Sequence, residues 1–247
     1  MKEWFPAMLD APEGHTVGSS VLYWLMAFLV LPLMLSLGTI NSRGQEYEIW
    51  MDIGYHVINF VCVLGLFFRY LRESFYTLRG NLKMVLGVSA IGAVLIIVIK
   101  LFCGVVAAIS GNISAMHAAF GTLLTTENDV LFYATAVLEI QPLWGTLCLG
   151  ILAPITVSCM LYATVFAPIC TSRPWLAYLI TAVMLLLQRL AMTISLFPLQ
   201  EELAIFAVQL PVHMLACWTY QKTDTVWTPI LLHVAVNMVI ALFICLM

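Results

Sequence analysis

Long apolar runs separated by short polar stretches dominate the pattern along this chain. Crossing a bilayer as an α-helix takes about 20 mostly apolar residues. By that rule we place spans near residues 18–38, 52–69, 84–108, 145–168, 175–196, 203–219 and 226–247. An eighth crossing is left open at 130–143, which is apolar but short. We therefore predict an all-α fold, a polytopic transmembrane helical bundle of seven or eight spans that forms a single domain, 1–247.

The basic residues between the spans predict the orientation of the bundle. The strongest positive cluster consists of Arg69, Arg72, Arg79 and Lys83. Basic loops favour the cytoplasmic side, so we expect a cytoplasmic loop at 69–83. Alternation then places Arg173 and Lys222 inside, the amino terminus inside with 1–17 as a cytoplasmic lead-in, and the carboxyl terminus outside.

Composition supports a membrane protein and argues against several other classes. Hydrophobic residues make up 63% of the chain and charged residues 9%, whereas soluble domains carry about 25% charged residues. The net charge of -3 and the scattered basic residues do not point to a nucleic-acid partner. The seven cysteines lie in or beside apolar runs without a CxxC pair, so we expect buried thiols and neither a metal nor a cofactor.

Polar side chains inside the spans are the candidate functional residues, because an unpaired polar group in a bilayer costs several kcal/mol. Lys100 and Glu139 are expected to form a structural ion pair, with separate solvation or a functional role as alternatives. His213 is expected to be a hydrogen-bonded histidine of the core. His56 and His117 lie near predicted interfaces, where we expect them to be solvated.

Two further pairs lie deeper in the predicted spans. Gln188 and Arg189 sit about two-thirds of the way along their span, where an arginine needs a partner or a wet cavity. His233 and Asn237 are four residues apart, so they share one helix face. Such a pair can position a carbonyl oxygen or can hydrogen-bond between helices, and the spacing does not choose between these roles.

The segment YQKTDTVWTPILLHVAVN, residues 220–237, resembles the last motif of the CAAX protease and bacteriocin-processing family. This is the Abi or CPBP family, which includes the type II CAAX prenyl endopeptidases. Its pattern is a tyrosine, a threonine turn, a Trp-x-Pro-Ile helix start and then HxxxN. The resemblance implies a CPBP-like core over 145–247, a helical bundle and a location in a bacterial plasma membrane.

The resemblance also implies where the other motifs of these glutamate-dependent intramembrane proteases would fall. The tripeptide at 153–155 precedes the family's Glu-Glu-xxx-Arg element, which places the two glutamates at Val157 and Ser158 and the arginine at Tyr162. The Phe-xxx-His element falls at Leu185 and Arg189. Of the signature only the HxxxN motif remains, and valine, serine and a protonated arginine cannot act as the general base.

Three functional hypotheses follow from the resemblance. The favoured one is a catalytically inactive scaffold that binds a membrane protein or a peptide, in bacteriocin immunity or processing or in regulation of a membrane complex. Its cavity would be lined by Ser158, Tyr162, Gln188, Arg189, His233 and Asn237. The second is an active CAAX-type endopeptidase with a non-standard site. The third is a small transporter or permease-like subunit whose path is lined by Lys100, Glu139 and Arg189.

Overall fold

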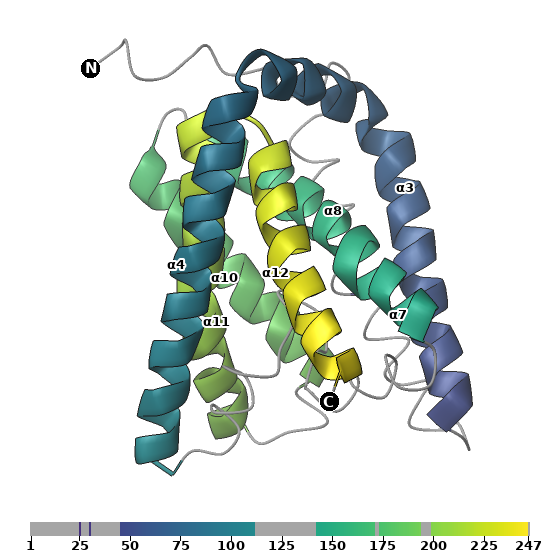
Figure 1. The fold of residues 1–247 in the computed structure, drawn as a ribbon, viewed down its shortest axis with the longest axis vertical. Helices are drawn as coiled ribbons and strands as arrows, with labels where there is room; N and C mark the ends of the chain where they lie inside the picture. The colour runs from purple at the N-terminus through teal and green to yellow at the C-terminus, as the bar shows by residue number, and fades with distance from the viewer. Residues whose placement is uncertain are drawn as a thin grey trace.

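The computed structural model describes residues 25, 30, 45–111, 142–170, 173–193 and 199–246, and these form a bundle of helices (Figure 1). No strand occurs in these ranges. The separate helices are α3 (Gln45–Gly80), α4 (Leu82–Ile109), α10 (Pro174–Thr193), α11 (Leu199–Thr223) and α12 (Trp227–Leu246). Between α4 and α10 lies one long helix in five segments: α7 (Pro142–Leu147), η3 (Cys148–Leu152), α8 (Ala153–Val157), η4 (Ser158–Phe166) and α9 (Ala167–Cys170). The segments η3 and η4 are π-helical.

The all-helical fold agrees with the sequence prediction, and the apolar spans agree in part. Four helices of the described ranges are long and apolar enough to cross a membrane: Ile53–Gly80, Leu82–Ile109, Pro142–Cys170 and Leu203–Thr223. Two shorter apolar helices are Pro174–Leu187 and Trp227–Val239. Most of the predicted span at 18–38 and most of the doubtful stretch 130–143 lie outside the described residues. The total of seven or eight spans therefore stays a prediction.

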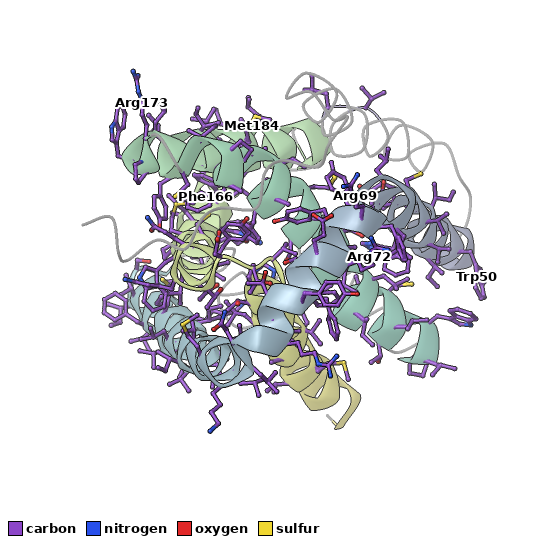
Figure 2. The ribbon with its side chains drawn as sticks, turned by 90° about the horizontal axis from the view of Figure 1, so that it is seen from above. Trp50, Arg69, Arg72, Phe166, Arg173 and Met184 are labelled. Atoms are coloured by element: carbon purple, nitrogen blue, oxygen red, sulfur yellow. The ribbon has the colours of Figure 1, made fainter. Side chains whose placement is uncertain are left out.

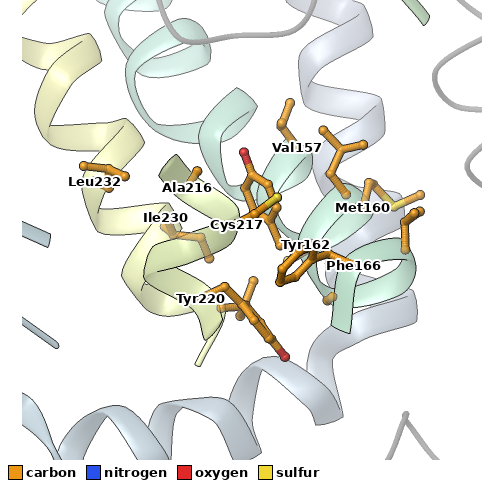
Figure 3. Packing of buried hydrophobic residues seen from close by; sticks show 14 of the residues in the cluster. Val157, Met160, Tyr162, Phe166, Ala216, Cys217, Tyr220, Ile230 and Leu232 are labelled. Carbon is orange, nitrogen blue, oxygen red and sulfur yellow. The ribbon is translucent and has the colours of Figure 1, made fainter. Parts of the chain in front are cut away.

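The long helix Pro142–Cys170 forms the centre of the bundle. Its most apolar stretch is 83% buried, against 28% for α4. Helices α3, α10 and α12 all pack against its segments. Figure 3 shows the resulting core, in which Tyr162 and Phe166 meet residues of α11 and α12 such as Cys217 and Ile230. The polar groups on the segments η3, α8 and η4 are therefore shielded from solvent and lipid.

Helix α4 approaches α11 and α12 closely at one glycine. A Cβ atom on Gly92 would lie 3.0 Å from Leu232 Cδ1 and 3.2 Å from Thr219 Cγ2. Since a glycine lets two helices come closer than a larger residue does, Gly92 sets the separation of α4 from both neighbours.

The stretch 69–83 was predicted to be a loop, and this prediction is wrong. Helix α3 continues to Gly80, and Asn81 alone separates it from α4. The reason is an amphipathic pattern: Tyr70, Ser74 and Leu78 recur at four-residue spacing and are all buried. In Figure 1, α3 runs up one side of the bundle, and its carboxy-terminal part then crosses the end of the bundle before α4 begins.

The basic residues that were predicted to be cytoplasmic gather at that same end of the bundle. Ser74 of α3 bonds to Thr225 in the turn after α11, and Tyr178 of α10 donates to Gln221 of α11. These contacts bring Arg173 and Lys222 to the end that α3 crosses, and Figure 2 views this end with Arg69, Arg72 and Arg173 labelled. Helix α12 ends at the opposite side (Figure 1). The grouping fits the predicted orientation, while the assignment of this end to the cytoplasm remains a prediction.

Candidate functional site

The turn between α11 and α12 fixes the position of the HxxxN motif. Asp224 adopts a positive φ of 53°, and its N–H donates to Tyr220 O at 2.8 Å, which ends α11. The amide N–H of Trp227 donates to Thr225 Oγ1 at 3.3 Å and so caps α12. Pro229 then lies in the first turn of α12, where its missing N–H is not needed.

A hydrogen bond from Asn237 joins α12 to the central helix. Its Nδ2 donates to Leu149 O at 2.9 Å, and Asn237 is completely buried. Leu149 lies in the π-helical segment η3, where Ala153 N–H donates to Cys148 O instead of to Leu149 O. The next residue, Pro154, has no N–H to give. The carbonyl of Leu149 therefore receives no hydrogen bond from Ala153 or Pro154, and the amide of Asn237 satisfies it.

His233 lies one turn earlier on the same face of α12 and is also completely buried. Its ring centroid is 5.8 Å from that of Tyr162 and 5.9 Å from that of His213. Tyr162 Oη and His213 Nδ1 are 3.1 Å apart and hydrogen-bonded. Neither ring nitrogen of His233 has a hydrogen-bond partner among the residues that the structure describes. The site is thus a compact group of two imidazoles and a phenol held by η4, α11 and α12.

Val157 and Ser158, at the positions where the family pattern has glutamates, are both fully buried. The hydroxyl of Ser158 has no hydrogen-bond partner within the described part of the chain. Since His233 has none either, the two side chains do not bond to each other. A serine nucleophile activated by His233 therefore lacks the required contact in this conformation.

Carboxylates lie away from this group in the part of the chain whose side chains are described. Those carboxylates are Glu73 and Asp224, and both are at the end crossed by α3. Glu73 Oε1 is 3.1 Å from Arg69 Nε. Burial raises the pKa of Asp224 from its ordinary value of 3.8 to about 6. The described neighbours of His233 therefore offer hydrogen bonding but no acidic partner for it.

The structure brings together four of the residues predicted to line a cavity. Ser158 and Tyr162 are one turn apart on η4, and His233 and Asn237 face the same central helix. Gln188 and Arg189 belong to α10, but their side chains lie outside the described residues. Their place in the cavity remains a prediction.

Other predicted polar residues have mixed outcomes. Lys100 is buried on α4. Its predicted partner Glu139 lies outside the described residues, as does His117. His56 was expected to be solvated, and this is wrong: it is 3% exposed on α3, in edge contact with Tyr55. A helix that begins at Gln45 places His56 well inside the bundle instead of at its rim.

The sequence correctly predicted that His213 is a hydrogen-bonded core histidine but did not connect it with His233. The sequence feature that indicates their contact is the short polar turn between their helices. A hairpin at Asp224 folds α12 back along α11, and residues on either side of it then come level. The spacing of His213 and His233 around that turn could have predicted the contact.

The apolar helices, the buried polar group and the basic end together define an integral membrane protein. Residues 139–239 match the family model described as "Type II CAAX prenyl endopeptidase Rce1-like". This part of the chain is therefore Rce1-like, and the match confirms the resemblance drawn from residues 220–237. Searches of curated proteins and of solved structures gave no match.

Proposed function

We propose that this Rce1-like membrane protein is catalytically inactive and binds another membrane protein or a peptide. The observation that carries the proposal is the replacement of the glutamate pair by Val157 and Ser158, both of them fully buried. Hydrolysis of a peptide in this family pattern needs a carboxylate to activate water, and neither a valine nor a serine can take that role.

The retained HxxxN motif is compatible with an inactive protein. Asn237 supplies the hydrogen bond that the carbonyl of Leu149 lacks, so its loss would leave a buried acceptor unpaired. A structural need of this kind accounts for the asparagine without any catalytic step. The presence of the motif is thus weak support for peptidase activity.

The buried polar atoms without partners support the binding part of the proposal. Ser158 Oγ and both ring nitrogens of His233 are buried, and no described residue bonds to them. Buried polar atoms without partners are destabilising, and they become satisfied when a polar ligand or water enters. We propose that a peptide or a membrane partner supplies the missing hydrogen-bond partners of Ser158 and His233, and that Gln188 and Arg189 make further contacts with it. Bacteriocin immunity or regulation of a membrane complex are the processes that the resemblance favours.

A cleavage assay tests the inactive half of the proposal. The full chain, His233→Ala and the double variant Val157→Glu/Ser158→Glu would be reconstituted into liposomes and given a prenylated CAAX peptide and an unprenylated control. We expect no cleavage by the unmodified protein above the level of His233→Ala. Cleavage that requires His233 would contradict the proposal and favour an active peptidase. Activity that appears in the double variant alone would identify the missing acid as the cause of inactivity.

Crosslinking in the native membrane tests the binding half. The unmodified protein would be compared with the triple variant Arg189→Ala/His233→Ala/Asn237→Ala, and with Thr219→Ala as a control. Thr219 is buried on α11, and its hydroxyl donates to Ala216 O of the same helix. We expect a discrete partner with the unmodified protein and the control, and its loss in the triple variant. A partner retained by all three proteins would place binding elsewhere on the bundle.

A further inference from the structure

The part of α3 that crosses the end of the bundle carries two different faces. Its inner face is buried and consists of Tyr70, Leu71, Ser74 and Leu78. Its outer side carries Phe68, Arg72, Phe75 and Arg79 at spacings of four, three and four residues, so these side chains form one continuous ridge. Phe68 is 62% exposed and Phe75 47% exposed, and both arginines are exposed. We call these four residues the Phe-Arg ridge.

Hydrogen bonds to the α11–α12 turn prevent the segment from rolling. Ser74 Oγ lies 2.7 Å from Thr225 Oγ1 and accepts from Val226 N–H at 3.2 Å. The indole Nε1 of Trp227 donates to Leu71 O at 3.1 Å. The buried face is thereby held against the bundle, and the Phe-Arg ridge is held outward.

The charges on the ridge have no acidic partner within the described residues. Arg69 lies on the neighbouring face and pairs with Glu73 at 3.1 Å, so its charge is partly compensated. Arg72 and Arg79 form no such pair in the described ranges. The two guanidinium groups, two helical turns apart, therefore remain uncompensated within the described ranges and lie next to exposed phenyl rings.

The chemistry of the ridge fits an anionic lipid surface. Aromatic rings on a helix that lies along the membrane surface insert at the level between headgroups and acyl chains, and basic residues beside them meet the phosphates. The planar guanidinium group can bind a phosphate through two parallel hydrogen bonds. Figure 2 views this end of the molecule, with α3 passing across it and Arg72 on that helix.

We propose that the Phe-Arg ridge is a binding site for the phosphate headgroups of anionic lipids, in the leaflet at this end of the bundle. The inference does not depend on the proposed function, because it holds for an active or an inactive protein. On this proposal, α3 is the element that recognises anionic lipids at the membrane surface. Through Ser74, the same element is bonded to the turn from which the helix of His233 begins.

Lipid binding to the purified full chain tests this proposal. The protein in a neutral detergent would be titrated with phosphatidylglycerol, or with phosphatidylcholine of the same acyl chains, and the adducts counted by native mass spectrometry. We expect stronger binding of phosphatidylglycerol to the unmodified protein. Each basic residue near an anionic surface contributes about fivefold to binding, so Arg72→Gln/Arg79→Gln should weaken this binding roughly 20-fold or remove its preference over phosphatidylcholine.

The matched control is Arg69→Gln/Lys222→Gln, which removes the same charge from exposed residues off the ridge. We expect the control to keep the preference for phosphatidylglycerol, and Arg72→Lys/Arg79→Lys to keep most of it. Equal binding of both lipids by the unmodified protein would overturn the proposal. So would an equal loss in the two glutamine variants, because that outcome reports net charge alone. Tighter binding of an acidic peptide than of the lipid would also overturn it, by assigning the ridge to a protein partner.

Discussion

The turn that leads into α12 and the middle of α12 differ in how their buried polar groups are satisfied. From the end of α11 through the turn to the first residues of α12, Thr223, Thr225 and Thr228 are buried and hydrogen-bonded to one another or to Ser74. One and a half turns further on, His233 is equally buried, and neither of its nitrogens has a partner in the described part of the chain. Both regions belong to the same 18-residue segment that resembles the family motif.

This difference separates structural residues from functional candidates within one motif. A fully satisfied buried network stabilises a fold and specifies one arrangement, whereas an unpaired polar group costs about 1 to 3 kcal/mol and needs another explanation. The threonine turn and the tryptophan hold α3 and α12 together. His233 contributes no described hydrogen bond to that task and is the residue in the motif for which a ligand is the natural explanation.

Ser74→Ala tests the satisfied region and should have the largest effect. It removes the acceptor of the Val226 N–H and the partner of Thr225 Oγ1 at once, in a site that is fully buried. We expect the free energy of unfolding to fall by about 2 to 3 kcal/mol. Thermal unfolding in detergent, followed by circular dichroism, measures the change. A decrease of under about 0.5 kcal/mol would mean that these bonds do not fasten α3.

Asn237→Leu tests the hydrogen bond from Asn237 of α12 to the central helix. The substitution keeps the branched skeleton of the side chain but leaves Leu149 O without the Nδ2 donor. We expect a loss of about 1 to 2 kcal/mol in the same unfolding assay. Asn237→Asp is the informative companion, because a carboxylate cannot donate to the carbonyl and should be worse than leucine. If aspartate is tolerated as well as asparagine, the bond to Leu149 is not the role of this residue.

The sequence predicted the apolar helices and the buried motif well, because both depend on local pattern. The hydrophobic runs gave α4, α10 and α12 nearly to their ends, and four-residue spacing put His233 and Asn237 on one face. The same reasoning failed at 69–83. The charged residues of this stretch favour a loop, but apolar residues recur among them at helical spacing. The charges bear on the predicted orientation in the membrane, whereas the apolar spacing determines the helical structure.

The partners of the site could not be predicted from the sequence, because they come from tertiary packing. The bond from Asn237 to Leu149 O depends on π-helical turns in the central helix, for which the sequence offered only Pro154 as a hint. The approach of His213 to His233 depends on how tightly the turn at Asp224 reverses the chain. Local patterns identify candidate residues, whereas the register between helices decides which of them meet.

His233→Phe tests the unsatisfied region directly. Phenylalanine keeps an aromatic ring between Tyr162 and His213 and removes two buried nitrogens that have no described partner. We expect the free energy of unfolding to stay unchanged or to rise by up to about 1 kcal/mol, since replacing an unpaired polar group by an apolar one is neutral or stabilising. His213→Phe is the matched comparison and should destabilise the protein, because it leaves Tyr162 Oη unpaired. Equal destabilisation by both variants would erase the contrast between the two regions.

The smallest expected effect is a pH dependence from Asp224, the acidic residue of the satisfied turn. Burial raises its pKa from 3.8 to about 6, so between these values the folded protein holds a proton that the unfolded chain has released. Stability is therefore fully present below about pH 4 and falls as the pH rises to about 6. The difference of about two pKa units limits the amplitude to about 3 kcal/mol. Because Asp224 lies in a turn at the end of the bundle, where an ionised carboxylate can gain water, we expect about 1 kcal/mol. Asp224→Asn, which tolerates the positive φ, should flatten the profile. A profile unchanged by Asp224→Asn would show that the turn carries no titrating group of the folded state.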